Sequence, residues 1–150
     1  MRRSICALFT VALLALPLLA EKKKVITPPE FAPAAGAPAP NFSPGVLVDG
    51  TLYVAGQTGA DLKTHEIPAD FEAEVKQTLD NIGLVLKAAG MTFQDVVAVQ
   101  VYLTDIDLFA RMNAVYGKVL TPPRPARTTV GVAKLAAPKA RIEITVTAHK

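Results

Sequence analysis

The chain has 150 residues, which is enough for one domain with a substantial core and too few for two ordinary domains. Its hydrophobic fraction of 51% is raised by an apolar run at the N-terminus. Without Arg2 and Arg3, which precede that run, 14 basic residues face 13 acidic ones. The remaining charge is then near +1, so we expect no basic surface for nucleic acid.

Residues 1–20 have the pattern of a secretory signal peptide. Arg2 and Arg3 precede an apolar stretch that is too short for a stable membrane span, and a charged segment begins at Glu21. We therefore predict an exported protein, either periplasmic or secreted. Leu18 is larger than the small residue that is usual three positions before a cleavage point, so an uncleaved membrane anchor is the alternative. Only in that case do we expect membrane association.

The only cysteine, Cys6, lies within this N-terminal segment. The rest of the chain has no thiol for a disulfide, a catalytic nucleophile or a thiolate metal site. Its two histidines, His65 and His149, are far apart in the sequence, so we expect no metal site.

Residues 21–40 are rich in proline and alanine, which predicts an extended, weakly ordered linker. A single domain is predicted over residues 41–150. It begins with two strands that meet at Asp49-Gly50, a dipeptide typical of tight hairpins. Gly56 in the second strand indicates either a place where a ligand or another backbone comes close, or a simple bulge.

A first helix is predicted to begin after Asp70, whose side chain can cap it. Glu72 and Glu74 stand in its first turn and Gly90 follows its end, so the charge and stop signals agree. Its apolar residues fall on one stripe, as expected for a helix that covers a sheet. The stripe consists of Phe71, Val75, Leu79, Ile82 and Leu86.

Residues 96–103 form a nearly continuous apolar run, which predicts a strand that is buried on both faces. A second helix is predicted over residues 108–120, with Asn113 inside it, and the following prolines end it. The apolar face expected for this helix consists of Leu108, Met112, Val115 and Val119.

Two strands near the C-terminus carry distinctive polar residues. Arg127 and Thr129 share one face of the first strand, and Glu143 stands between two isoleucines of the second. We expect Arg127 and Glu143 to lie near each other. Judged from these residues alone, they form either a plain cross-strand ion pair or part of a binding site.

The predicted element order, ββαβαββ, gives an α+β fold in which two helices pack on one face of a mixed sheet. The polar face of the last strands carries several threonines and Glu143. This face is too polar for a core and has few long charged side chains for a free surface. We therefore expect a subunit interface to cover it.

Six separated segments carry a resemblance to a known family. They are LYVAGQ at 52–57, LKAAG at 86–90, VQVYLTD at 99–105, FARMN at 109–113, PAR at 125–127 and IEI at 142–144. In this order they resemble the reactive intermediate deaminase family, also called the RidA/YjgF/YER057c/UK114 family. The resemblance covers about residues 38–148.

The resemblance implies a chorismate-mutase-like fold and a homotrimer with a central β-barrel, whose three clefts lie between subunits. It also implies a deaminase that uses no cofactor and hydrolyses 2-imino acids, formed from enamines, to 2-keto acids and ammonia. Arg127 matches the arginine that grips the substrate carboxylate, and Glu143 matches the glutamate that positions the attacking water. The matching substrate-binding positions are Phe42, Ala55, Gly56, Asn113 and Thr129.

Three of these positions depart from the family pattern. Phe42 stands where catalytic members commonly have a tyrosine, Ala55 where serine is frequent, and Thr129 where many have a cysteine. The lost polar contacts at Phe42 and Ala55 suggest a more apolar substrate. Two other functions stay open: a non-catalytic trimer that binds small carboxylate ligands through Arg127, and an endoribonuclease-type relative, which the nearly neutral charge disfavours.

Overall fold

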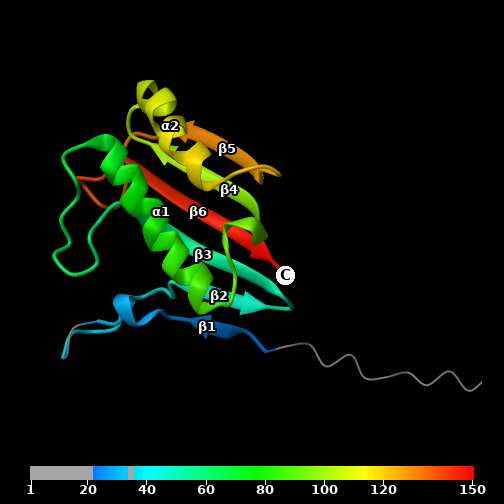
Figure 1. Cartoon of the computed structure of the whole chain (residues 1–150). Helices are drawn as coiled ribbons and strands as arrows, with labels where there is room; N and C mark the ends of the chain where they lie inside the picture. Colours follow the sequence, from blue (N-terminus) through cyan, green and yellow to red (C-terminus); the bar gives the residue numbers. More distant parts are fainter. Residues whose placement is uncertain (1–21, 34–35) are drawn as a thin grey trace, which may run out of the picture.

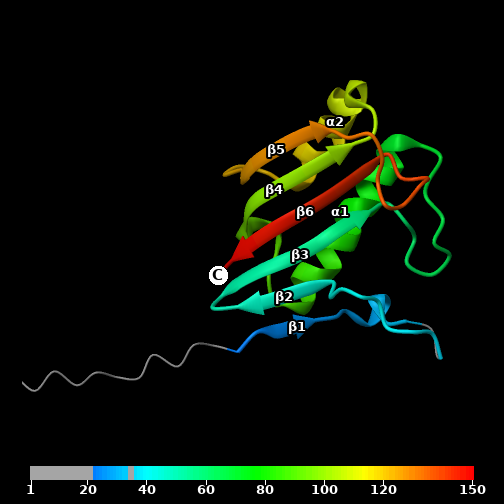
Figure 2. The same ribbon diagram turned by 180° about the vertical axis from the view of Figure 1, so that it is seen from behind.

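The computed structural model describes residues 22–33 and 36–150, and within them one mixed sheet carries two α-helices on a single face (Figure 1). Figure 2 shows the opposite face of the sheet, which no helix of the described residues covers. The helices are α1 (Phe71–Ala88) and α2 (Phe109–Val119). The strands are β1 (Lys24–Ile26), β2 (Gly45–Val48), β3 (Thr51–Thr58), β4 (Val96–Leu103), β5 (Ala126–Gly131) and β6 (Ile142–His149). Short 3-10 turns span Pro29–Phe31, Phe93–Asp95 and Ile106–Leu108.

The strands lie side by side in the order β1-β2-β3-β6-β4-β5. All neighbouring pairs are antiparallel except β4 and β5, which are parallel because α2 connects them as a crossover. From β2 onward the element order is the predicted ββαβαββ, and the α+β fold class is confirmed.

Strand β1 departs from the expectation of a linker over residues 21–40. Lys24–Ile26 pairs antiparallel with β2, and Ile26 is buried in the core with 4% of its surface exposed. Val25 and Ile26 are β-branched residues that suit an edge strand. The proline-rich composition of the residues that follow concealed this short strand.

Helix α1 forms where its sequence signals predict it. The Asp70 carboxylate accepts a hydrogen bond from the backbone N of Ala73, which satisfies one of the free donors at the helix start. All five residues of the predicted apolar stripe are buried. Burial of such side chains stabilises a fold by about 1.5–3 kcal/mol each.

Helix α2 buries Met112 and Tyr116 most deeply, whereas Val115 and Val119 are only half-buried. The predicted apolar face is therefore rotated slightly, so that the Tyr116 ring packs in the core. Strand β4 is also less buried than expected. Val99, Val101 and Leu103 face the helices, but the alternate side chains lie on the uncovered face of the sheet.

The uncovered face exposes large apolar side chains in the isolated chain, among them Tyr53 and Val130. Among the described residues, no helix is both long enough and apolar enough to cross a bilayer. The predictions of a signal peptide or an anchor for residues 1–20 lie outside the described residues.

Candidate functional site

Arg127 lies on edge strand β5 and extends toward α2. Its guanidinium donates a hydrogen bond of 2.9 Å to the Asn113 side-chain carbonyl. It also lies 4.6 Å from the centre of the Tyr116 ring and 5.6 Å from that of Phe109, within the range of cation–π attraction. The structure thus brings together Arg127 and Asn113, two of the predicted site residues. All of these contacts with the guanidinium come from side chains of α2.

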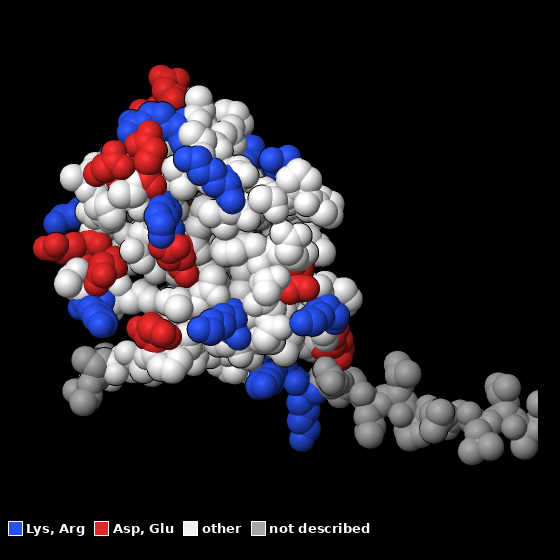
Figure 3. All heavy atoms as spheres, viewed as in Figure 1, with Lys and Arg blue, Asp and Glu red and all other residues white. Residues whose placement is uncertain are grey.

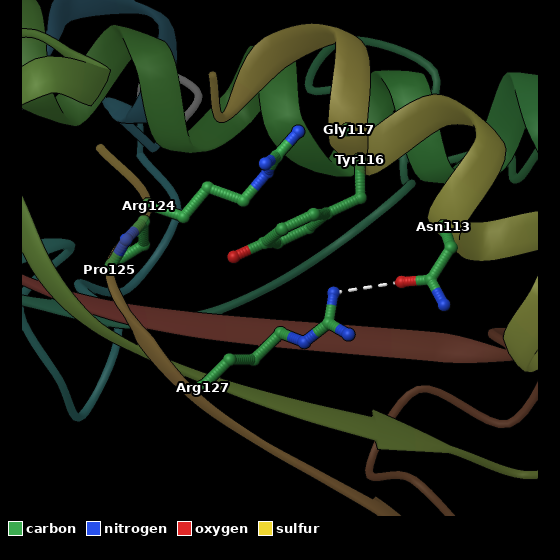
Figure 4. A pocket seen from close by; sticks show the side chains of 6 residues that line it. All are labelled: Asn113, Tyr116, Gly117, Arg124, Pro125 and Arg127. Carbon is green, nitrogen blue, oxygen red and sulfur yellow. Dashed lines mark hydrogen bonds between the residues drawn. The ribbon is translucent and has the colours of Figure 1, made fainter. Parts of the chain in front are cut away.

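A cavity of about 450 Å³ opens beside this guanidinium. Figure 4 shows the side chains that line it, with the Tyr116 ring between those of Arg124 and Arg127. The lining residues are Asn113, Tyr116, Gly117, Arg124, Pro125 and Arg127. A cavity of this size accommodates a small organic ligand. We call these residues the arginine half-site.

Two hydroxyl groups in this region have no hydrogen-bond partner among residues 22–33 and 36–150. They belong to Tyr116 and Thr129, and both oxygen atoms are buried. Burial raises the pKa of the Tyr116 hydroxyl, and the nearby guanidinium groups of Arg127 and Arg124 counteract only part of this effect. The hydroxyl is therefore protonated at neutral pH and can donate a hydrogen bond to a ligand.

Glu143 lies beside Gly56, where β6 pairs with β3. A Cβ atom at Gly56 would overlap with the Glu143 carboxylate. Only glycine at this position therefore leaves room for the carboxylate where it lies. The structure therefore brings two more predicted site residues together. We call Gly56 and Glu143 the glutamate half-site.

The two half-sites lie on opposite faces of the sheet, so the expectation that Arg127 and Glu143 lie near each other is wrong within one chain. Strand β4 runs between β5 and β6. Arg127 shares the helix-covered face with its buried register partner Val99. Glu143 points the other way, because Ile142 and Ile144 on either side of it are buried in the core. A site with both groups needs a second copy of the chain.

Of the other predicted substrate-binding residues, Thr129 follows Arg127 on the same face of β5. Ala55 precedes Gly56, and its backbone N donates a hydrogen bond to the carbonyl of Pro44. That bond holds the segment with Phe42 beside β3, and the Phe42 ring is 62% exposed. Ala55 therefore adjoins the glutamate half-site, and the exposed Phe42 stands two residues before the Pro44 that is bonded to Ala55.

A buried carboxylate at the start of β6 was not recognised from the sequence. Glu74 on α1 is fully buried and accepts hydrogen bonds from the backbone N of Arg141 at 2.6 Å and of Ile142 at 3.3 Å. Its second oxygen accepts from Arg141 Nε at 2.6 Å. These bonds fix the start of β6, one residue before Glu143. The signal was available, because Glu74 falls on the same helical face as Phe71 and Thr78.

In the described part of the chain, no three His, Cys, Asp or Glu side chains gather as a set of metal ligands. Some of the acidic side chains there form ion pairs instead, such as Glu72 with Arg111 and Asp80 with Lys76.

Comparison with known proteins gives the family. A family model described as Endoribonuclease L-PSP matches residues 32–150. The 2-iminobutanoate/2-iminopropanoate deaminase of Bos taurus is 44% identical over 115 residues, which are 75% of this chain and 80% of that protein. The chain belongs to the RidA/YjgF family.

Other RidA/YjgF relatives agree over most of their length. A RutC family protein of Saccharolobus solfataricus is 43% identical over 80% of this chain and 95% of that protein. The crystal structure of RidA from an Antarctic Psychrobacter is 35% identical, with a TM-score of 0.76 over 85% of this chain and 99% of that one. The YjgF gene product of E. coli is 36% identical, with a TM-score of 0.73 over 85% and 98%. The resemblance noted in the sequence is thereby confirmed.

Proposed function

We propose that this protein is a 2-imino acid deaminase that hydrolyses its substrate to a 2-keto acid and ammonia. The observation that carries the proposal is the Arg127 guanidinium, held by Asn113 at the wall of a cavity. A relative that is 44% identical, named 2-iminobutanoate/2-iminopropanoate deaminase, supports the reaction type. The overall reaction adds one water across the C=N bond and releases ammonia, so it needs no redox partner.

Arg127 binds the substrate carboxylate in this proposal. A planar guanidinium holds a carboxylate by two parallel hydrogen bonds, and this fixes the adjacent imine carbon relative to the attacking water. The bond to Asn113 and the contact with the Tyr116 ring keep the guanidinium in one orientation before the substrate arrives.

Glu143 of a second copy supplies the carboxylate that accepts a proton from the water. The water oxygen then bonds to the imine carbon, the nitrogen takes up protons, and the C–N bond breaks to release ammonia. General-base assistance of this kind contributes typically about 10² to 10⁴ in rate. The exposed apolar residues of the uncovered sheet face support an oligomer, and we propose the homotrimer that the family resemblance implies.

Export stays part of the proposal, on the pattern of residues 1–20 alone.

The endoribonuclease alternative shares its name with the family model. Figure 3 shows acidic and basic side chains interspersed over the helix-covered face, an arrangement that differs from the basic stripe expected of an RNA-binding surface. The alternative of a carboxylate binder uses Arg127 and has no role for Glu143.

The deciding experiment generates imino acids in place with an amino-acid oxidase and follows the release of 2-keto acid and ammonia by the full chain. We expect Arg127→Ala and Glu143→Gln each to abolish most of the acceleration. Glu66→Gln, an exposed carboxylate elsewhere on the surface, is the matched control and should keep full activity. Binding of a keto acid that depends on Arg127, with no turnover of any imine, would instead establish the binder.

A further inference from the structure

The arginine half-site holds more positive charge than one carboxylate needs. Both Arg124 and Arg127 line the cavity. Within residues 22–33 and 36–150, neither has an acidic partner within 4.0 Å, whereas Arg111 and Arg141 are paired with Glu72 and Glu74. The two unpaired guanidinium groups therefore stand on the wall of one cavity.

The other polar groups in this cavity are also hydrogen-bond donors. The Tyr116 side chain is 4% exposed, and its hydroxyl has no partner among the described residues. A buried donor without a partner destabilises the fold, and a ligand acceptor would remove that cost. The Asn113 carbonyl is already used by Arg127, so its amide NH₂ is what this side chain has left to offer. The charged side chains that line the cavity are therefore both cationic, and its neutral side chains can donate hydrogen bonds.

We infer that the cavity binds a ligand with two acidic groups, so that the preferred substrate is a dicarboxylic 2-imino acid. This inference rests on the proposed function and specifies its substrate class. Arg127 takes the carboxylate next to the imine. Arg124 takes the second carboxylate, which also accepts a hydrogen bond from the Tyr116 hydroxyl.

Glu143 of the second copy brings one negative charge to the same site, and the two guanidinium groups face it together with the substrate. The inference therefore requires that Arg124 meets the side-chain end of the substrate, whereas Glu143 acts at the imine end beside Arg127. The inference replaces the expectation of a more apolar substrate, which rested on Phe42 and Ala55, because the substrate side chain meets Arg124 here.

The test compares imines that differ only in the second acidic group: those of aspartate and asparagine, and those of glutamate and glutamine. For the full-length wild type, kcat/KM should be higher for the acidic member of each pair. In Arg124→Gln this preference should fall by about tenfold, the size of one charge-assisted hydrogen bond, with the amide substrates unchanged. Tyr116→Phe keeps the ring under Arg127 and should lower the same preference. Lys118→Gln removes a neighbouring exposed positive charge on α2 and should leave the preference intact.

A binding measurement separates failure of this inference from failure of the proposed function. Calorimetry with 2-oxoglutarate and 2-oxobutanoate needs no turnover. Tighter binding of 2-oxoglutarate that is lost in Arg124→Gln supports the inference, even if no imine is hydrolysed. Turnover without preference for the acidic substrates, or an equal loss for all substrates in Arg124→Gln, would overturn it and leave the deaminase assignment standing.

Discussion

Arg127 and Glu143 point to opposite faces of one sheet, and strand β4 lies between the strands that carry them. Asn113 and Tyr116 orient the Arg127 side chain. The Glu143 carboxylate occupies the space that a side chain at position 56 would otherwise fill. Changes in one half-site should therefore leave the geometry of the other unchanged. If Arg127 binds the substrate and Glu143 activates the water, as proposed, this separation allows binding and chemistry to be disturbed independently.

Gly56→Ala tests the role of the glutamate half-site. The new methyl group would overlap with the end of the Glu143 side chain, which can swing aside at little cost to the fold. We expect kcat to fall by about tenfold or more, with a smaller change in KM, because the carboxylate grip of Arg127 is untouched. Steady-state kinetics on one imine substrate measures both constants.

The control for this change is Gly83→Ala on α1. A Cβ there meets only the Phe93 ring, at the ordinary contact distance of 3.5 Å. Replacement of a helical glycine by alanine should stabilise the fold by about 0.5–1 kcal/mol and leave kcat unchanged. An unaltered kcat in Gly56→Ala would show that the position of Glu143 does not matter for the reaction.

Glu74→Ala should destabilise the fold far more than Glu72→Ala, a change at a partly exposed residue of the same helix. The change leaves the backbone N–H groups of Arg141 and Ile142 without their acceptor and removes the buried partner of the Arg141 guanidinium. We expect a loss of about 2–4 kcal/mol in the free energy of unfolding, measured with urea. Glu72→Ala breaks an exposed ion pair and should have a much smaller effect. Equal losses of unfolding free energy in the two variants would contradict the stabilising role assigned to the buried Glu74 carboxylate.

Glu72 gives a prediction for acid stability. Its hydrogen bonds from Arg111 lower the pKa of the Glu72 carboxyl from 4.5 to about 2. As the pH falls, the unfolded chain takes up this proton first, so the contribution of Glu72 is fully present above pH 4.5 and is lost toward pH 2. The difference in unfolding free energy between wild type and Glu72→Gln should therefore shrink over that window. A difference that stays constant from pH 7 to pH 2.5, followed by urea unfolding, would show that the ion pair is absent in solution.

The helices could be predicted from the sequence because their signals are local. Asp70 before α1 and Gly90 after it mark its ends, and the apolar spacing marks its buried face. On α2 the same reasoning placed Val115 on the buried face of the helix, whereas the structure buries Tyr116. The spacing alone could not assign Tyr116, because an aromatic ring with a polar end suits either the buried or the exposed face.

The arrangement of the strands could not be predicted in the same way. Arg127 and Glu143 stand on consecutive strands of the chain, and consecutive strands are usually neighbours in a sheet. Here β6 inserts between β3 and β4, which is a matter of long-range pairing with no local signal. The resemblance supplied the candidate site residues, but the structure was needed to divide them into two half-sites and to find Arg124 and Tyr116 beside Arg127.

Complementation between two inactive variants tests the central claim most directly. Arg127→Ala retains an intact glutamate half-site, and Glu143→Gln retains an intact arginine half-site. If each active site takes one half from each of two copies, equal and random mixing restores the intact pairing in about one quarter of the sites. We therefore predict that co-refolded or co-expressed variants recover about one quarter of wild-type deaminase activity. Mixed oligomers, verified by two affinity tags, that remain as inactive as either variant alone would contradict the account.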